Sequence, residues 1–155
     1  MRKIFSFILL LAASFSVYSQ SKELPVGTEA ASLKVFDQLV SKYKNDNSQI
    51  GDLLLKVATE FIGEPYVSNT LEQDGAEQLV VNLKELDCTT FAENCLAIAR
   101  TIKMANPTYD AFKHELTRIR YRDGVLTDYT SRLHYFSDWI FDNDKKSIVK
   151  NISCS

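Results

Sequence analysis

The residue best suited to chemistry is Cys88, in the segment Leu86-Asp87-Cys88-Thr89-Thr90-Phe91. Asp87 is a favoured N-cap residue, so Cys88 is expected in the first turn of a helix. Unpaired backbone N–H groups and the positive end of the helix dipole surround that position. They stabilise a thiolate, the nucleophilic form of cysteine, and they can hold the oxyanion that forms when a carbonyl is attacked. The pattern predicts a nucleophile; the alternative is a small apolar residue packed at a helix start.

The other two cysteines have different expected roles. Cys95 lies seven residues further along the same expected helix and is predicted to be a core residue. The helical rise separates it from Cys88 by about 10 Å, more than the ~7 Å that a disulfide spans. A disulfide with Cys154 stays open. The chain has no CxxC and no Cys/His cluster with metal-ligand spacing, so a structural zinc site is not expected. The sequence implies no other metal and no organic cofactor.

The elements that must position Cys88 are mostly helices. Apolar residues recur at helical spacing, and they predict helices over 28–44, 50–61, 87–103, 109–121 and 131–141. Gln78–Leu83 is β-branched in its middle and is expected to be extended, and Ser147–Ile152 is expected to start a second strand. Two short strands make a marginal sheet on their own.

The N-terminus has the pattern of an export signal. Arg2 and Lys3 precede an apolar run, and small residues near Ser19–Gln20 fit a cleavage site, so residues 1–19 are predicted to be a signal peptide and 20–155 the mature chain. The run is too short for a membrane span. The mature chain is expected in the periplasm or secreted, with no stable membrane anchor. The net charge is −2 and falls further when the signal is removed, so nucleic acid is not an expected partner.

Several ordered motifs extend the pattern around Cys88. They are Gly63-Glu64-Pro65-Tyr66-Val67, Thr70-Leu71-Glu72, Glu77–Leu83 (EQLVVNL), Leu86–Asn94 (LDCTTFAEN), Ile119–Gly124 (IRYRDG) and Ser131–Ile140 (SRLHYFSDWI). The series resembles the NlpC-type cell-wall cysteine hydrolases of the papain-like superfamily. The branch it is most similar to is the N-acetylmuramoyl-L-alanine amidase-like one, formerly a domain of unknown function. The resemblance covers about Val57 to Asn143.

The resemblance implies roles for individual residues. Cys88 is the expected nucleophile, and Asp87 and Tyr66 are expected to hold the first amino acid of a stem peptide. Thr89 follows the nucleophile, and Thr70 and Glu72 are expected in a loop that faces the cleft. The polar positions of a later segment are expected to line the sugar side: Ser131, Arg132, His134, Ser137 and Asp138.

The fold implied by the resemblance is α+β: the helix-rich N-terminal half of a papain-like cysteine hydrolase, with most of the antiparallel sheet missing. The base of such an enzyme is a histidine on a later strand, and this chain has only His114 and His134. His114 is expected to be solvated. His134 as the base is a minor alternative. The chain is therefore expected to be a partial amidase-like domain, or else a natural short form.

Two kinds of function follow from these expectations. The first is a peptidoglycan amidase that cleaves the bond between N-acetylmuramic acid and L-alanine, truncated and without its catalytic histidine. The second is a periplasmic protein that binds muropeptide, or another partner, without cutting. Peptidoglycan or a muropeptide is the expected partner in both cases: the amidase would cleave it, and a muropeptide-binding protein would hold it intact.

Overall fold

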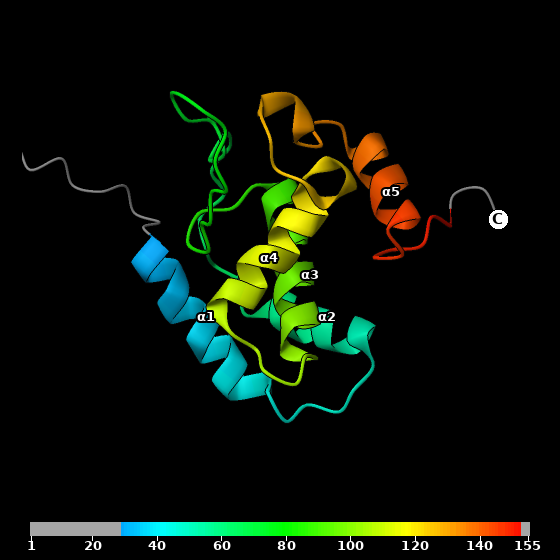
Figure 1. Cartoon of the computed structure of the whole chain (residues 1–155). Coiled ribbons are helices and arrows are strands. Elements are labelled where there is room, and N and C mark those ends of the chain that lie inside the picture. The colour runs from blue at the N-terminus through cyan, green and yellow to red at the C-terminus, as the bar shows by residue number, and fades with distance from the viewer. Residues whose placement is uncertain (1–28, 153–155) are drawn as a thin grey trace, which may run out of the picture.

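Helix α3 (Cys88–Ile102) lies at the centre of the molecule and packs against three other helices (Figure 1). The computed structural model describes residues 29–152. The other helices are α1 (Glu29–Tyr43), α2 (Ile50–Thr59), α4 (Tyr109–Arg120) and α5 (Phe136–Lys145), with short 3₁₀ turns η1 (Arg122–Gly124) and η2 (Tyr129–Ser131). Because α3 is covered by α1, α2 and α4, most of its length is buried, and its two exposed residues, Cys88 and Phe91, lie in its first turn.

The outer helices bury apolar stripes against this centre. Phe36 of α1 stacks on Phe112 of α4, with 5.2 Å between the ring centroids, and meets Tyr109 edge-on at 5.5 Å. Leu53 and Val57 of α2 are fully buried. One cluster of buried residues joins α1, α2, α3 and α4 with Leu133 and Trp139, so these parts share a single core.

The first four expected helices are confirmed to within a few residues, whereas the fifth was placed too early. Helix α5 begins at Phe136 and not at Ser131. Ser131 instead completes a capping box with Asp128 in η2. The residues that follow are extended, because Arg132 forms a bridge with Tyr121 and the N–H of Leu133 donates to Arg120 O at 3.0 Å.

The expected α+β class is wrong: in residues 29–152 the structure is helical and forms no strand, and β-type pairing is limited to two isolated bridges. The papain-like sheet is therefore absent from this part of the chain. Gln78–Leu83 is irregular because its backbone bonds to helix side chains and not to a strand. Ser32 Oγ donates to Val81 O and accepts from Leu83 N–H. Three more carbonyl groups of this segment accept from side chains: Gln78 O from Tyr121, Val80 O from Arg120 and Asn82 O from Asn94.

The strand expected to start at Ser147–Ile152 is also not formed. The N–H groups of Ile148 and Val149 both donate to Asn143 O, at 2.9 and 3.3 Å, so the chain folds back over the end of α5. Ser147 has a left-handed φ of 56°, the conformation that commonly ends a helix.

No helix in residues 29–152 is long and apolar enough to cross a bilayer. The expected signal peptide, residues 1–19, lies outside the described residues.

Candidate functional site

Asp87 caps the helix that begins with Cys88, as expected. Its Oδ1 accepts from Thr90 N–H at 2.7 Å, and Thr90 Oγ1 accepts from Asp87 N–H at 2.9 Å, which completes a capping box. The first N–H groups of a helix have no intrahelical acceptor. With Thr90 satisfied, the N–H groups of Cys88 and Thr89 have no acceptor among the described residues. Cys88 is exposed, so two backbone donors lie beside an accessible thiol.

Tyr66 is held close to this turn by backbone pairing. It forms a parallel bridge with Leu86, in which Leu86 N–H donates to Pro65 O at 3.2 Å and Val67 N–H donates to Leu86 O at 3.1 Å. The Tyr66 side chain is 71% exposed. The Gly-Glu-Pro-Tyr turn is thus hydrogen-bonded to Leu86, which lies two residues before Cys88 in the sequence. The tyrosine side chain of this turn is accessible to a ligand.

A polar cleft of about 150 Å³ opens beside the start of α3. Four segments line it: the loop over residues 69–72, the first turns of α3, the end of α4 and the extended stretch after η2. The lining residues are Asn69, Leu71, Glu72, Asp87, Thr89, Glu93, Arg120, Arg132, Leu133 and His134. The Tyr121–Arg132 bridge and the Leu133 hydrogen bond hold the last of these segments against α4.

Two buried arginines form the charged part of the cleft. Arg132 is 5% exposed and pairs with Glu72 at 3.0 Å and with Glu77 at 3.2 Å. Arg120 and Glu93 are each about 1% exposed, and Arg120 Nε lies 2.7 Å from Glu93 Oε2. Such pairs hold their elements in register, because removing one partner leaves the other charge buried and alone.

Neither histidine hydrogen-bonds to Cys88. His134 Nε2 lies 2.8 Å from Tyr129 O, and its ring packs on the Tyr129 ring at 4.2 Å. His114 is exposed on α4. In the described part of the chain, the only hydrogen-bond partner of Cys88 Sγ is Thr89 Oγ1, at 4.0 Å. The thiol therefore has no histidine partner in residues 29–152.

Cys95 lies inside the core, as expected, and burial raises the pKa of its thiol to about 12. Cys88 and Cys95 are both free, so no disulfide joins them. Cys154 lies outside the described residues.

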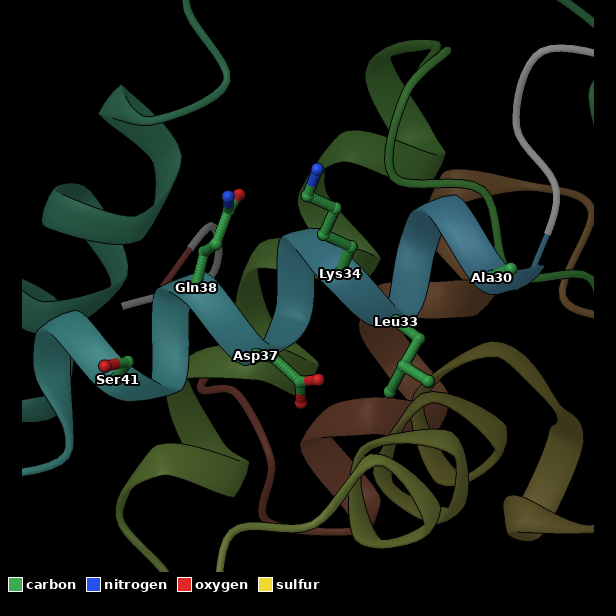
Figure 2. A pocket seen from close by; sticks show the side chains of 6 residues that line it. All are labelled: Ala30, Leu33, Lys34, Asp37, Gln38 and Ser41. Carbon is green, nitrogen blue, oxygen red and sulfur yellow. The ribbon is translucent and has the colours of Figure 1, made fainter.

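No group of three His, Cys, Asp or Glu side chains in the described residues is arranged to hold a metal ion. A wider and shallower hollow of about 420 Å³ runs along the outer face of α1. Figure 2 shows the side chains that line it: Ala30, Leu33, Lys34, Asp37, Gln38 and Ser41. None of them is a candidate site residue, and they form no nucleophile or acid–base pair.

The cleft brings together five of the residues singled out from the sequence: Glu72, Asp87, Thr89, Arg132 and His134. Thr70 does not line it; its Oγ1 is buried and has no hydrogen-bond partner. Ser131, Ser137 and Asp138 do not line it either, and Asp138 pairs with Arg122 at 2.5 Å.

Sequence reasoning gave no role to Arg120 and Glu93, which line the cleft. A signal for them was present in the sequence. Both are charged residues in register with the buried stripes of their helices, where a charge requires a buried partner.

Comparison with known proteins identifies a family to which this chain is similar. The model of the AmiA-like family, described as N-acetylmuramoyl-L-alanine amidase-like, matches residues 56–155. A comparison with curated proteins gave no match.

Several solved structures are similar to this chain. A crystal structure of an N-acetylmuramoyl-L-alanine amidase from Bacteroides uniformis is 43% identical with a TM-score of 0.59, over 64% of this chain and 41% of that one. A structure described as a xylanase from Bacteroides fragilis is 41% identical with a TM-score of 0.61, and the match covers 64% of this chain and 43% of that one. A Legionella pneumophila protein shares the fold alone. It is 20% identical with a TM-score of 0.57, and the match covers 75% of this chain and 36% of that one.

This chain thus spans about two fifths of the length of the two Bacteroides structures. The family match covers well over half of its residues and includes the capped helix and the cleft. The chain belongs to the AmiA-like family, whose members are N-acetylmuramoyl-L-alanine amidase-like.

Proposed function

We propose that this protein acts on the muramyl peptides of the bacterial cell wall as a cysteine amidase, with Cys88 as the nucleophile. One observation supports this most: an exposed thiol begins a capped helix, beside two backbone N–H groups without acceptors and a polar cleft. The family match and the name of the Bacteroides uniformis relative support the choice of bond, the amide between N-acetylmuramic acid and L-alanine.

The proposed reaction has two steps. Cys88 Sγ attacks the lactyl carbonyl carbon of the muramyl group, and the N–H groups of Cys88 and Thr89 donate to the oxyanion. The C–N bond breaks, a thioester remains on Cys88, and the thiol proton leaves with the amine of L-alanine. Water then hydrolyses the thioester, which restores the thiol and releases N-acetylmuramic acid.

The neighbours of Cys88 fit substrate binding in this scheme. We assign Asp87 and the exposed Tyr66 to the L-alanine side. Asp87 uses only Oδ1 for the cap, so Oδ2 is free to accept from a ligand. Glu72, Arg132 and His134 lie across the cleft, on the side that we assign to the sugar. Thr89 contributes its backbone N–H, and Thr70, outside the cleft, is given no direct contact.

The name of the Bacteroides fragilis relative suggests a glycosidase, and the carboxylates of the cleft argue against this. Glycoside hydrolysis uses a pair of carboxyl groups, one as an acid and one as a base or nucleophile. Here Glu93 is paired with Arg120, Glu72 with Arg132, and Asp87 caps α3. Each of these carboxylates therefore already has a structural partner.

A second function, binding of muropeptides without cleavage, is favoured by one observation. Cys88 has no histidine partner in residues 29–152, and a cysteine amidase needs a base within hydrogen-bond reach of the thiol. The cleft and the capped helix would then hold a muramyl peptide and leave it intact.

Muramyl dipeptide separates the two functions. Incubation with the wild-type chain should release N-acetylmuramic acid, detected by mass spectrometry. Cys88→Ala should abolish release, and Cys95→Ala, outside the cleft, should keep it. If the wild type releases nothing, calorimetry on Cys88→Ala decides: affinity for the dipeptide supports binding alone, and no affinity refutes both functions.

The place of action is also a proposal. The apolar N-terminal pattern of residues 1–19 and a cell-wall substrate both support export to the periplasm or beyond, with residues 20–155 as the mature chain. Mass spectrometry of the exported protein tests it, because a mature N-terminus at Gln20 is expected. An uncleaved chain in the cytoplasm would contradict it.

A further inference from the structure

Arg120 is the most deeply buried polar side chain of the cleft. It is the last residue of α4, 1% exposed, and two of its three nitrogens are bonded. Nε donates to Glu93 at 2.7 Å and Nη1 donates to Val80 O at 2.6 Å. The third nitrogen, Nη2, is buried and has no hydrogen-bond partner. A guanidinium offers five N–H donors, so the two N–H groups of Nη2 are left unmatched in a residue that lines the cleft.

An unmatched buried donor of this kind needs an explanation, because such groups are rare in folded proteins and destabilising. The Glu93 and Val80 contacts fix the plane of the guanidinium, so Nη2 cannot turn toward another protein group without breaking one of them. The group is therefore held ready for an acceptor that comes from outside the protein.

The charges of the cleft decide which acceptor fits. Glu72, Asp87 and Glu93 supply three carboxylates against the two guanidinium groups of Arg120 and Arg132. Both arginines are already ion-paired, so the cleft has no spare positive charge. A charged oxygen placed at Nη2 would add another negative group beside these carboxylates, whereas an uncharged oxygen of the ligand accepts a hydrogen bond without adding charge. Amide carbonyls and sugar hydroxyls are such oxygens, and a muramyl peptide contains both.

We propose that Arg120 Nη2 donates a hydrogen bond to an uncharged oxygen of the bound muramyl peptide and so selects ligands at the base of the cleft. This inference rests on the proposed function. Arg120 lies at the end of α4 and Cys88 at the start of α3, so the two residues would grip the ligand from different helices.

Arg120→Lys tests the proposal. Lysine keeps the positive charge opposite Glu93 but has a single nitrogen, so it loses the free donor. Affinity for muramyl dipeptide, measured by calorimetry on a Cys88→Ala background, should fall about tenfold or more. Arg100→Lys is the matched control, because Arg100 pairs with Glu115 away from the cleft, and it should leave affinity unchanged. L-alanyl-D-isoglutamine alone shows whether the acceptor is in the peptide or in the sugar.

A second measurement uses the unmutated side chain, in case Arg120→Lys does not fold. In a ¹⁵N NMR titration on the same Cys88→Ala background, the Arg120 guanidinium signals should shift with muramyl dipeptide while those of Arg100 stay in place. Unchanged Arg120 signals at saturation, or wild-type-like affinity in folded Arg120→Lys, would overturn the role of Arg120 alone. No affinity for muramyl dipeptide in the parent protein would overturn both this inference and the proposed function.

Discussion

Cys88 and Cys95 lie on one helix in opposite surroundings, and this difference is testable. Cys88 is exposed at the first turn, whereas Cys95 is 2% exposed and burial raises the pKa of its thiol to about 12. Only the thiolate reacts with iodoacetamide. Of these two thiols, we expect Cys88 to be modified in the folded chain and Cys95 to stay unmodified, as measured by peptide mass spectrometry.

Unfolding in denaturant provides the control for this prediction, since Cys95 should then react as well. Cys88→Ser should lose the modification in the folded state. Equal labelling of Cys88 and Cys95 in the folded protein would contradict the burial of Cys95.

The capping box at Asp87 gives a second prediction at this scale. Asp87→Ala removes the acceptor for Thr90 N–H and should lower the free energy of unfolding by about 1 kcal/mol. Asp87→Asn keeps a side-chain oxygen in the same place and should retain most of the stability. Urea unfolding of the three proteins is the measurement. The prediction fails if the alanine variant is as stable as the wild type.

Residue-level features were predictable from the sequence where their causes are local. The cap, the first-turn position of Cys88 and the burial of Cys95 depend on a few neighbouring residues, and the structure confirms them. The Arg120–Glu93 pair joins residues 27 positions apart, and no local pattern specifies which charges meet. The same holds for Arg132, whose partner Glu72 lies 60 positions away.

At the scale of elements, Glu115 connects α3 with α4. It accepts from Arg100 of α3 at 2.6 Å and from Arg118 of its own helix at 2.8 Å. Burial raises the pKa of Glu115, but the two arginines outweigh it, so the pKa is held below its usual 4.5. The ionised form is thus favoured in the folded state. Its contribution to stability is present above the unfolded-state pKa and is lost as the pH falls through the lower folded-state value.

We therefore predict that Glu115→Gln destabilises the protein most near neutral pH. The difference from wild type in the free energy of unfolding, measured with urea, should be larger at about pH 7 than at about pH 3.5, because the contribution of the ionised carboxyl falls once the pH is below the unfolded-state pKa. Asp110→Asn is the control, because that side chain is 90% exposed on the same helix. An equal loss at both pH values for Glu115→Gln would contradict the ion pairing.

The expected elements differ in how far the sequence could define them. The apolar stripes of α1 to α4 repeat with helical spacing, and their helices formed where expected. Gln78–Leu83 has the β-branched composition of a strand, yet a strand needs a neighbour to bond. Ser32, Arg120 and Tyr121 provide the partners instead, and they lie 40 or more positions away in the sequence. Tertiary contacts therefore overrode the local preference.

At the scale of the whole molecule, the cleft depends on helices that are far apart in the sequence staying packed together. Helix α1 contributes no residue to the cleft, but Ser32 bonds the backbone of Val81 and Leu83, next to the Val80 carbonyl that holds Arg120. The Phe36–Phe112 stack fixes α1 on α4, whose last residue is Arg120. The aromatic contact and the position of the arginine are thus linked through one core.

Phe112→Ala tests this linkage. Phe112 is fully buried, and its removal should lower the free energy of unfolding by about 3–5 kcal/mol, a large share of the ~5–15 kcal/mol typical of a folded domain. Phe141→Ala is the control, because that ring is 69% exposed and its loss should change stability by less than about 0.5 kcal/mol. Because α1 and α4 share one core, circular dichroism and tryptophan fluorescence should report a single, coincident urea transition in both variants. Trp139 lies on α5, so separate transitions in Phe112→Ala would mean that α1 detaches on its own and that the core is not one cooperative unit.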